Sequence, residues 1–281
     1  EGTDTVWVSD NVTINYIDNV EKMYANGNNN ITINGNSSDN WMGSYSTNAN
    51  NITLAGGAGD DTYFINGTGL ASGGVTITEN NSEGTDTIEF TGFNLDLNNY
   101  SNIENATITG SSNYNVTGDS GNNVLTGNSG NNVLDGGAGD DTMVGGTGSD
   151  TYIVDSASDV VTEGSGTSGT DTVQSSSISL DLSNYSNVEN LTLTGSSNID
   201  ATGNSENNTL TGNSGNNEID GNGGTDTVVF SDTKANVIST FGFHHNNASA
   251  IVIKGTYGTD TIVDCENIQF SDGTISVADL K

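Results

Sequence analysis

The stretch GDSGNNVLTGNSGNNVLDGGAGDDTMVGGTGSDTYI, residues 118 to 153, decides the fold of this chain. It consists of four consecutive nine-residue units of the form GGxGxDxUx, where U is a large apolar residue. Glycines at the first, second and fourth positions permit positive φ and close backbone packing, which predicts a turn. The seventh to ninth positions alternate polar, apolar, polar, which predicts a short strand with one inward side chain. One such strand cannot bury itself, so the units are expected to stack into a continuous ladder.

The chain also repeats on a longer scale. Residues 84 to 144 align without a gap to residues 169 to 229 at a constant offset of 85, which places Tyr100 on Tyr185 and Glu104 on Glu189. Further nonapeptides lie at 35–43, 56–64, 203–211, 212–220 and 221–229. We therefore predict an all-β fold, a right-handed parallel β-roll or β-helix solenoid with a carboxyl-terminal β cap. Its expected parts are a diverged first copy (1–83), a second copy with four tandem nonapeptides (84–168), a third copy (169–230) and a terminal cap (231–281).

The charge of the chain is strongly one-sided. Asp and Glu number 36 against 4 Lys plus Arg, a formal net charge of -32. The compact state must withstand this repulsion unless something neutralises it, and multivalent cations would do so. The same sign argues against nucleic acid, because phosphate binding needs basic patches. With 31% hydrophobic residues a disordered acidic tail is the alternative, above all without cations, although the regular spacing of Val, Ile, Leu and Tyr argues against it.

The sequence shows no constellation of catalytic residues. His244 and His245 are the only histidines, without an HExxH motif, and are expected in an exposed loop. No serine lies in GxSxG. The single Cys265 excludes an internal disulfide and is expected to be a small buried apolar residue. We therefore expect a chain that is not an enzyme.

Signals for targeting are equally sparse. No run of about 18 apolar residues predicts a membrane span, and residue 1 opens no signal peptide. The first residues lie within a repeat, so we expect the chain to be a fragment of a longer protein. Export of that protein from the cell is therefore not excluded.

The tandem nonapeptides resemble the calcium-binding repeats-in-toxin (RTX, hemolysin-type) family, whose members fold as parallel β-rolls and commonly leave bacteria by type I secretion. The resemblance covers about a quarter to a third of the chain and rests on four units in register plus three more at the 85-residue offset. It implies Ca²⁺ as cofactor, bound between turns by the carboxylate of the sixth position and by glycine-turn carbonyls. Ca²⁺ prefers six to eight hard oxygen ligands, which agrees with this donor set. It also implies an extracellular or cell-surface location in a bacterium.

Carried over by register, the resemblance assigns a set of metal ligands. The looser GTDT units contribute Asp86 and Asp171 at the same phase, as well as Asp4 and Asp260. The expected ligands are Gly57, Gly59, Asp61, Asp86, Asn123, Asn132, Gly137, Gly139, Asp141, Gly146, Gly148, Asp150, Asp171, Asn208, Gly223 and Asp226.

Several sixth positions depart from the family pattern because they hold asparagine. Pairing alternate units puts Asn123 with Asp141, Asn132 with Asp150, and Asn208 with Asp226. Each such site has one carboxylate instead of two, which predicts weak affinity of about 10⁻⁴ to 10⁻³ M and some empty turns. The alternative for the Asn turns is a hydrogen-bonded asparagine ladder that needs no metal.

The function expected is that of a secreted calcium-binding β-solenoid that folds on Ca²⁺ outside the cell. It would serve as a structural or surface segment, such as a stalk, matrix, surface layer or filament, with possible self-association, further repeats of the same protein, and no membrane insertion. The alternative is the carboxyl-terminal export and stability module of a secreted enzyme or adhesin. Carbohydrate adhesion would require clustered exposed aromatics, whereas Trp7 and Trp41 are far apart in sequence and expected at apolar strand positions. The Thr-x-Thr triads are too sparse for an ice-facing array.

Overall fold

The computed structural model describes residues 4–16, 20, 22–27, 29–45, 50–67, 74–164, 169–234, 238–243, 249–255 and 258–280. The chain packs into two compact units, residues 1–148 and 149–281. The boundary falls inside the second sequence copy. Packing units and sequence copies are therefore different divisions of the chain.

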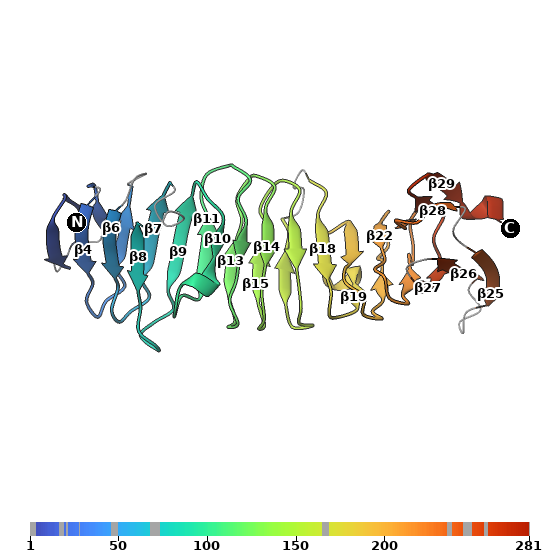
Figure 1. Cartoon of the computed structure of the whole chain (residues 1–281), viewed down its shortest axis with the longest axis horizontal. Coiled ribbons are helices and arrows are strands. Elements are labelled where there is room, and N and C mark those ends of the chain that lie inside the picture. Colours follow the sequence, from blue (N-terminus) through green and yellow to red (C-terminus); the bar gives the residue numbers. More distant parts are fainter. Residues whose placement is uncertain are drawn as a thin grey trace. The chain divides into compact units, whose positions relative to one another are not determined.

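Unit 1 is a stack of short parallel strands, of which β4, β6 and β8 can be followed side by side in Figure 1. One sheet has the order β1 (Thr5–Val8), β3 (Lys22–Ala25), β5 (Trp41–Ser44), β7 (Thr62–Asn66), β9 (Thr87–Thr91), β11 (Asn105–Ile108), β13 (Val124–Thr126), β15 (Thr142–Val144). A second has β2 (Val12–Asn15), β4 (Asn29–Asn34), β6 (Asn50–Ala55), β8 (Val75–Thr78). A third has β10 (Leu95–Asp96), β12 (Val116–Thr117), β14 (Val133–Asp135). Successive strands alternate between sheets, as in a solenoid.

Unit 2 begins with the same architecture. One sheet has the order β16 (Thr151–Ile153), β18 (Thr172–Ser175), β20 (Asn190–Leu193), β22 (Thr209–Thr211), β24 (Thr227–Val229), β28 (Asn267–Phe270), β29 (Gly273–Ser276). The other has β19 (Leu180–Asp181), β21 (Ala201–Thr202), β23 (Glu218–Asp220), β27 (Gly258–Val263), β26 (Ser249–Gly255), β25 (Ile238–Phe243). The unit also contains β17 (Val160–Thr162).

The core is a column of eighth-position side chains. Leu125 pairs in register with Ala106 on one side and Met143 on the other, and all three are fully buried. The alternating burial of β13 to β16 follows the polar, apolar, polar pattern of each nonapeptide. Burying one such side chain contributes about 1.5–3 kcal/mol, so each added turn stabilises its neighbours mainly through this column.

The described residues also contain short 3₁₀ segments. They are η1 (Leu97–Asn99), η2 (Leu182–Asn184) and η4 (Val277–Leu280), and the described residues contain no α-helix. Asp96 and Asp181 cap the first two by accepting the backbone N–H of the residue two positions on. Both segments bury a leucine, so they act as wider turns of the same solenoid.

At the end of unit 2 the strands change from parallel to antiparallel pairing. β27 joins the solenoid in parallel with β23, after which β26 and β25 add in antiparallel order. Likewise β28 pairs in parallel with β24 and antiparallel with β29. The all-β parallel solenoid expected from the nonapeptides is confirmed.

Candidate functional site

The glycine turns stack so closely that side chains are excluded from them. Gly137 and Gly139 have φ of 83° and 141°. An ideal Cβ on Gly139 would lie 2.5 Å from the carbonyl oxygen of Gly121 in the preceding turn. The same conformation and close approach recur at Gly57, Gly59, Gly146 and Gly148. Backbone carbonyls of one turn are thus held against the next turn along the same edge.

The turn at residues 221–226 differs in detail. Gly224 (φ 121°) rather than the predicted Gly223 occupies the tight position, with its ideal Cβ directed at the Glu206 carbonyl. Asn222 has a φ of 61°, a value that asparagine tolerates better than most residues. The role of Gly223 as a carbonyl ligand stays a prediction.

The sixth-position side chains form ladders between turns. Asp61 Oδ1 accepts the backbone N–H of Asn40 at 2.7 Å, and Asp86 Oδ1 accepts that of Asp61 at 2.8 Å. Two of the predicted pairs are neighbours in these ladders, because Asp141 accepts from Asn123 N and Asp226 from Asn208 N, each at 2.8 Å. Asn132 and Asp150 belong to different units. All the sixth-position side chains predicted as ligands are buried, in unit 1 Asp61, Asp86, Asn123, Asn132 and Asp141, and in unit 2 Asp150, Asp171, Asn208 and Asp226. Asp4 is exposed.

Asparagine at this position satisfies itself by hydrogen bonding. Asn123 Oδ1 accepts the N–H of Asp119 at 2.8 Å, and its Nδ2 donates to the Glu104 carbonyl at 2.9 Å. Asn208 makes the equivalent pair of bonds with Asn204 N and the Glu189 carbonyl. Such bonds would satisfy an asparagine turn without metal, which is the alternative that the sequence leaves open, and calcium ligation by Asn123 and Asn208 stays a prediction.

Aspartate at the same position has one carboxylate oxygen that receives no hydrogen bond. Oδ2 of Asp61 and Oδ2 of Asp226 are buried and have no hydrogen-bond donor among the described residues. Burial raises the pKa of Asp61 to about 7, against the opposing effect of the bond from Asn40, and burial also raises the pKa of Asp226. A buried, unsatisfied carboxylate oxygen is costly unless a cation or proton accompanies it. These residues therefore fit a calcium ion, for which they supply the hard anionic donor.

Glutamates continue the ladder where the nonapeptides stop, and the sequence interpretation missed them. Oε2 of Glu104, Glu189 and Glu266 accepts the N–H of Asp86, Asp171 and Asp226 respectively, each at 2.8 Å. Each glutamate is followed by asparagine and a strand, and Glu104 and Glu189 are one 85-residue offset apart. That recurring Glu-Asn pair was the available signal.

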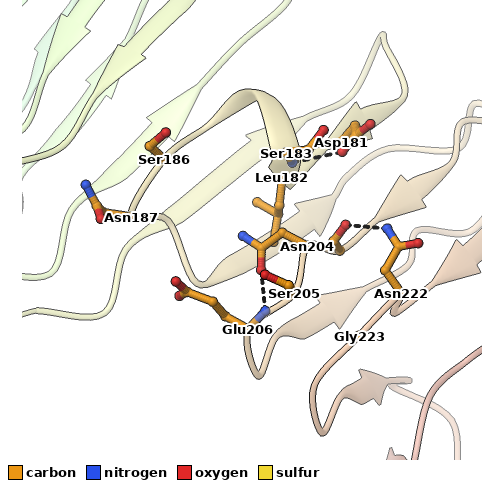
Figure 2. Close-up of a pocket in the computed structure, with 11 residues that line it drawn as sticks. Asp181, Leu182, Ser183, Ser186, Asn187, Asn204, Ser205, Glu206, Asn222 and Gly223 are labelled. Atoms are coloured by element: carbon orange, nitrogen blue, oxygen red, sulfur yellow. Dashed lines mark hydrogen bonds between the residues drawn. The ribbon is translucent and has the colours of Figure 1, made fainter.

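A polar pocket of unit 2 adjoins these turns (Figure 2). It lies between η2 and the turns at Asn204 and Asn222, where Asn222 Nδ2 donates to the Gly203 carbonyl at 2.7 Å. At the equivalent place in unit 1, Asn98 Nδ2 donates to the Gly118 carbonyl at 2.9 Å. The residue 85 positions after Asn98 is Ser183, which lines the pocket. Its shorter side chain leaves room that the asparagine amide would fill.

The outer face of unit 1 carries an aromatic patch, Trp7, Tyr24, Trp41, Tyr45 and Phe64. Trp7 stacks on Tyr24 with ring centroids 5.0 Å apart, and Tyr45 lies 5.0 Å from Phe64. Trp7 is 53% exposed and Tyr45 40% exposed. Trp7 and Trp41 lie in strands, as expected, but Trp7 is largely exposed. Parallel stacking brings aromatic residues that are far apart in sequence together on one face, a clustering that the sequence did not predict.

Cys265 is free and buried, and burial raises the pKa of its thiol. His244 and His245 lie outside the described residues. Within the described part of the chain, no helix is long and apolar enough to cross a membrane.

Taken together, the described residues define a parallel β-solenoid, a repeat architecture whose stacked glycine turns present buried carboxylates. A family model, the RTX calcium-binding nonapeptide repeat, matches four copies in residues 53–64, 117–152 and 202–232. The chain therefore contains RTX repeats, which are calcium-binding, and Ca²⁺ is the expected ion. No curated protein matches the chain.

Proposed function

We propose that this chain is a secreted segment of a bacterial surface protein that folds when it meets extracellular Ca²⁺ and then serves as a structural element. A stalk, matrix, surface layer or filament would suit a stack of repeats that lacks a catalytic constellation. The observation that carries the proposal is the buried, orphaned carboxylate oxygen of Asp61 and Asp226 in a chain of net charge -32. The full set of predicted ligands, the extracellular location and the absence of catalysis are parts of the same proposal.

In this proposal Ca²⁺ shifts the equilibrium between an extended and a stacked chain by mass action. Where free Ca²⁺ is scarce, repulsion among buried carboxylates disfavours the stacked state and keeps the chain extended enough for export. Outside the cell the ion binds only the stacked state and shifts the equilibrium towards it, by about 2.7 kcal/mol for one site at a hundredfold excess over Kd. Several turns in register add such contributions.

Circular dichroism with chelator and with millimolar Ca²⁺ tests the proposal. We expect strand signal to be low in chelator and to rise cooperatively with Ca²⁺. A strand signal that neither chelator nor added calcium changes would overturn it.

An export and stability module of a secreted enzyme or adhesin would use the same calcium-driven folding. The sequence of the full gene product separates the two roles. More 85-residue copies outside this chain support the structural role, whereas a catalytic domain upstream supports the module.

A second candidate function is carbohydrate binding, favoured by the aromatic patch of unit 1. Exposed Trp and Tyr rings offer broad apolar faces with polar edges, a combination suited to partly apolar, hydroxyl-rich surfaces. Binding to polysaccharides, followed by the tryptophan fluorescence of the calcium-loaded chain, tests it. Trp7→Ala and Tyr45→Ala should weaken binding without changing the calcium-dependent strand signal, and equal binding by the parent chain and both variants would reject this function.

A further inference from the structure

The polar pocket of unit 2 is built by one 3₁₀ segment and two glycine turns (Figure 2). Leu182 and Ser183 come from η2, and the turns at Asn204 and Asn222 supply much of the remaining lining. Its volume of about 650 Å³ lies within the range of pockets that hold small molecules. All of the lining residues lie between positions 181 and 223, so the pocket is complete within one unit.

The 85-residue repeat provides an internal comparison for this pocket. In unit 1, Asn98 is the second residue of η1, and its Nδ2 donates to the Gly118 carbonyl at 2.9 Å, which ties the 3₁₀ segment to the turn. In unit 2 the corresponding residue is Ser183, whose hydroxyl makes no hydrogen bond among the described residues. The side chain that crosses this space in unit 1 therefore has no counterpart in unit 2.

The turn carbonyl that loses this partner is satisfied by another residue. The Gly203 carbonyl, which corresponds to that of Gly118, accepts the Asn222 amide at 2.7 Å. Next to Asn222, unit 2 has Gly223 where unit 1 has alanine. An ideal Cβ on Gly223 would have its nearest neighbour at 3.8 Å, the Cα of Ser205. The carbonyl is thus paired without closing the pocket, and the space lacks the methyl group that unit 1 has at this position.

The pocket presents polar groups with unused hydrogen-bonding capacity. The hydroxyls of Ser186 and Ser205 make no hydrogen bond among the described residues. Asn204 Oδ1 accepts the backbone N–H of Glu206 at 2.9 Å, whereas its Nδ2 has no acceptor within the described part of the chain. Asp181 Oδ1 accepts one backbone N–H at 2.8 Å, and its Oδ2 receives none from a described residue. Donors and acceptors therefore face the same small space.

The charge of the lining selects the class of ligand. Asp181 and Glu206 are acidic, and no Lys, Arg or His belongs to the described residues that line the pocket, so an anion would be repelled. Leu182 is the one large apolar side chain of this lining and is buried, which leaves little apolar surface for an apolar ligand. Serine hydroxyls and asparagine amides donate and accept, and carboxylates accept hydroxyl protons. A neutral molecule with several hydroxyl groups matches this lining.

We propose that this pocket binds a neutral sugar residue, either as a free monosaccharide or within a polysaccharide chain. The carboxylates of Asp181 and Glu206 accept sugar hydroxyls in charge-assisted hydrogen bonds, and Asn204 Nδ2 donates to a sugar oxygen. Ser186 and Glu206 are exposed, so the pocket opens to solvent and a longer chain can reach it. The aromatic patch lies in unit 1, and the inference depends neither on that patch nor on calcium binding by the glycine turns.

Filling the pocket with the residue types of unit 1 tests the proposal. The double variant Ser183→Asn, Gly223→Ala does this, and because the other copy carries the same residue types, the solenoid should keep its strand signal. The control is Ser196→Asn, which changes an exposed serine of the same unit outside the pocket. Saturation-transfer difference NMR on the calcium-loaded full chain measures binding of glucose, galactose and mannose, and pull-down on dextran, galactan and mannan measures binding of polymers of these sugars.

The parent chain and the control should bind at least one of these probes, and the filled variant should lose that binding. A monosaccharide signal assigns the site to the free sugar, whereas binding of a polymer alone assigns it to a sugar within a chain. Failure of every probe to bind the parent chain, or equal binding by the filled variant, would overturn the proposal.

Glu206→Gln keeps the test decisive if the filled variant does not fold. It changes an exposed side chain and should weaken binding about tenfold, as expected for the loss of a hydrogen bond to a charged group. The uronic acid of the sugar that binds should bind more weakly than the neutral sugar, because the two carboxylates of the pocket repel it. Unchanged binding by Glu206→Gln, or tighter binding of the uronic acid, would contradict the proposal. Trp7→Ala should leave these results unchanged, and calcium-dependent folding can persist in either outcome, so failure here is distinct from failure of the proposed functions.

Discussion

At the sixth position of each turn, aspartate and asparagine occupy the same place with different consequences. Asn208 uses both amide atoms in hydrogen bonds, whereas Asp226 keeps one buried oxygen without a donor. A single oxygen-to-nitrogen difference therefore decides whether the buried side chain finds all its partners within the protein. Under the proposed function, the mixture of the two residues along the chain would set how strongly folding depends on calcium.

The variant Asp226→Asn should reduce this dependence. Its amide can donate where the carboxylate cannot, so the chelated protein should gain about 1–3 kcal/mol in the free energy of unfolding, the usual cost of an unsatisfied buried acceptor. Urea denaturation in chelator measures the gain. The reciprocal Asn208→Asp should lower stability in chelator, and a loss of stability in Asp226→Asn would contradict the argument.

The metal-free protein should be more stable in acid than at neutral pH. Burial raises the pKa of Asp61 to about 7 and those of Asp86 and Asp260 to about 6, above the value of about 4 expected in the unfolded chain. Groups with raised folded-state pKa stabilise fully below the unfolded pKa and lose this contribution as pH rises through the folded one. Thermal unfolding in calcium-free buffer from pH 4 to pH 7.5 should show a falling midpoint. A rising midpoint would exclude the assignment.

At the scale of the element, the nonapeptide is a turn and a strand with opposite demands. The turn needs backbone without side chains, since Gly139 packs against Gly121 of the preceding turn. The strand needs one large apolar side chain, such as Leu125 or Met143, to build the core column. Neither part is stable without a neighbouring turn, so stability resides in the contacts between units.

The variant Gly139→Ala should weaken this stacking. A methyl group there would meet a carbonyl oxygen at 2.5 Å in a backbone with φ of 141°, strain that costs about 1–3 kcal/mol. The control is Gly121→Ala, whose ideal Cβ has its nearest neighbour at 3.3 Å, a side-chain oxygen of Asp119. Urea unfolding in calcium should separate the two variants, and equal stabilities would show that the turns relax.

For the whole molecule, the net charge of -32 opposes the compact, stacked state through electrostatic repulsion. Screening by salt and ligation of Ca²⁺ both reduce the repulsion among carboxylates, but they act on different carboxylates. Salt screens exposed carboxylates over a Debye length of about 3 Å at 1 M, whereas the buried oxygens are reached only by an ion that enters the turns.

Calcium should therefore induce folding that a high ionic strength does not induce. Strand signal should rise at millimolar Ca²⁺ and stay low in about 1 M NaCl, and Mg²⁺ should be less effective because it demands shorter, octahedral coordination. Circular dichroism in the three solutions measures the difference. Full folding in NaCl alone would mean that general screening, and not ligation, drives the transition.

The sequence by itself determined the all-β parallel solenoid, the inward eighth position and the register that makes Asn123 and Asp141 neighbours. These follow from local rules, glycine in the turns and alternation in the strands, repeated at a fixed period. Only the tertiary structure decided what lies across the stack. It brought Glu79 against Asp61 and gathered Trp7 with Tyr45 on an outer face. The reason is that spacers of unequal length separate these residues, so the contact between turns, and not the spacing in sequence, sets which side chains meet.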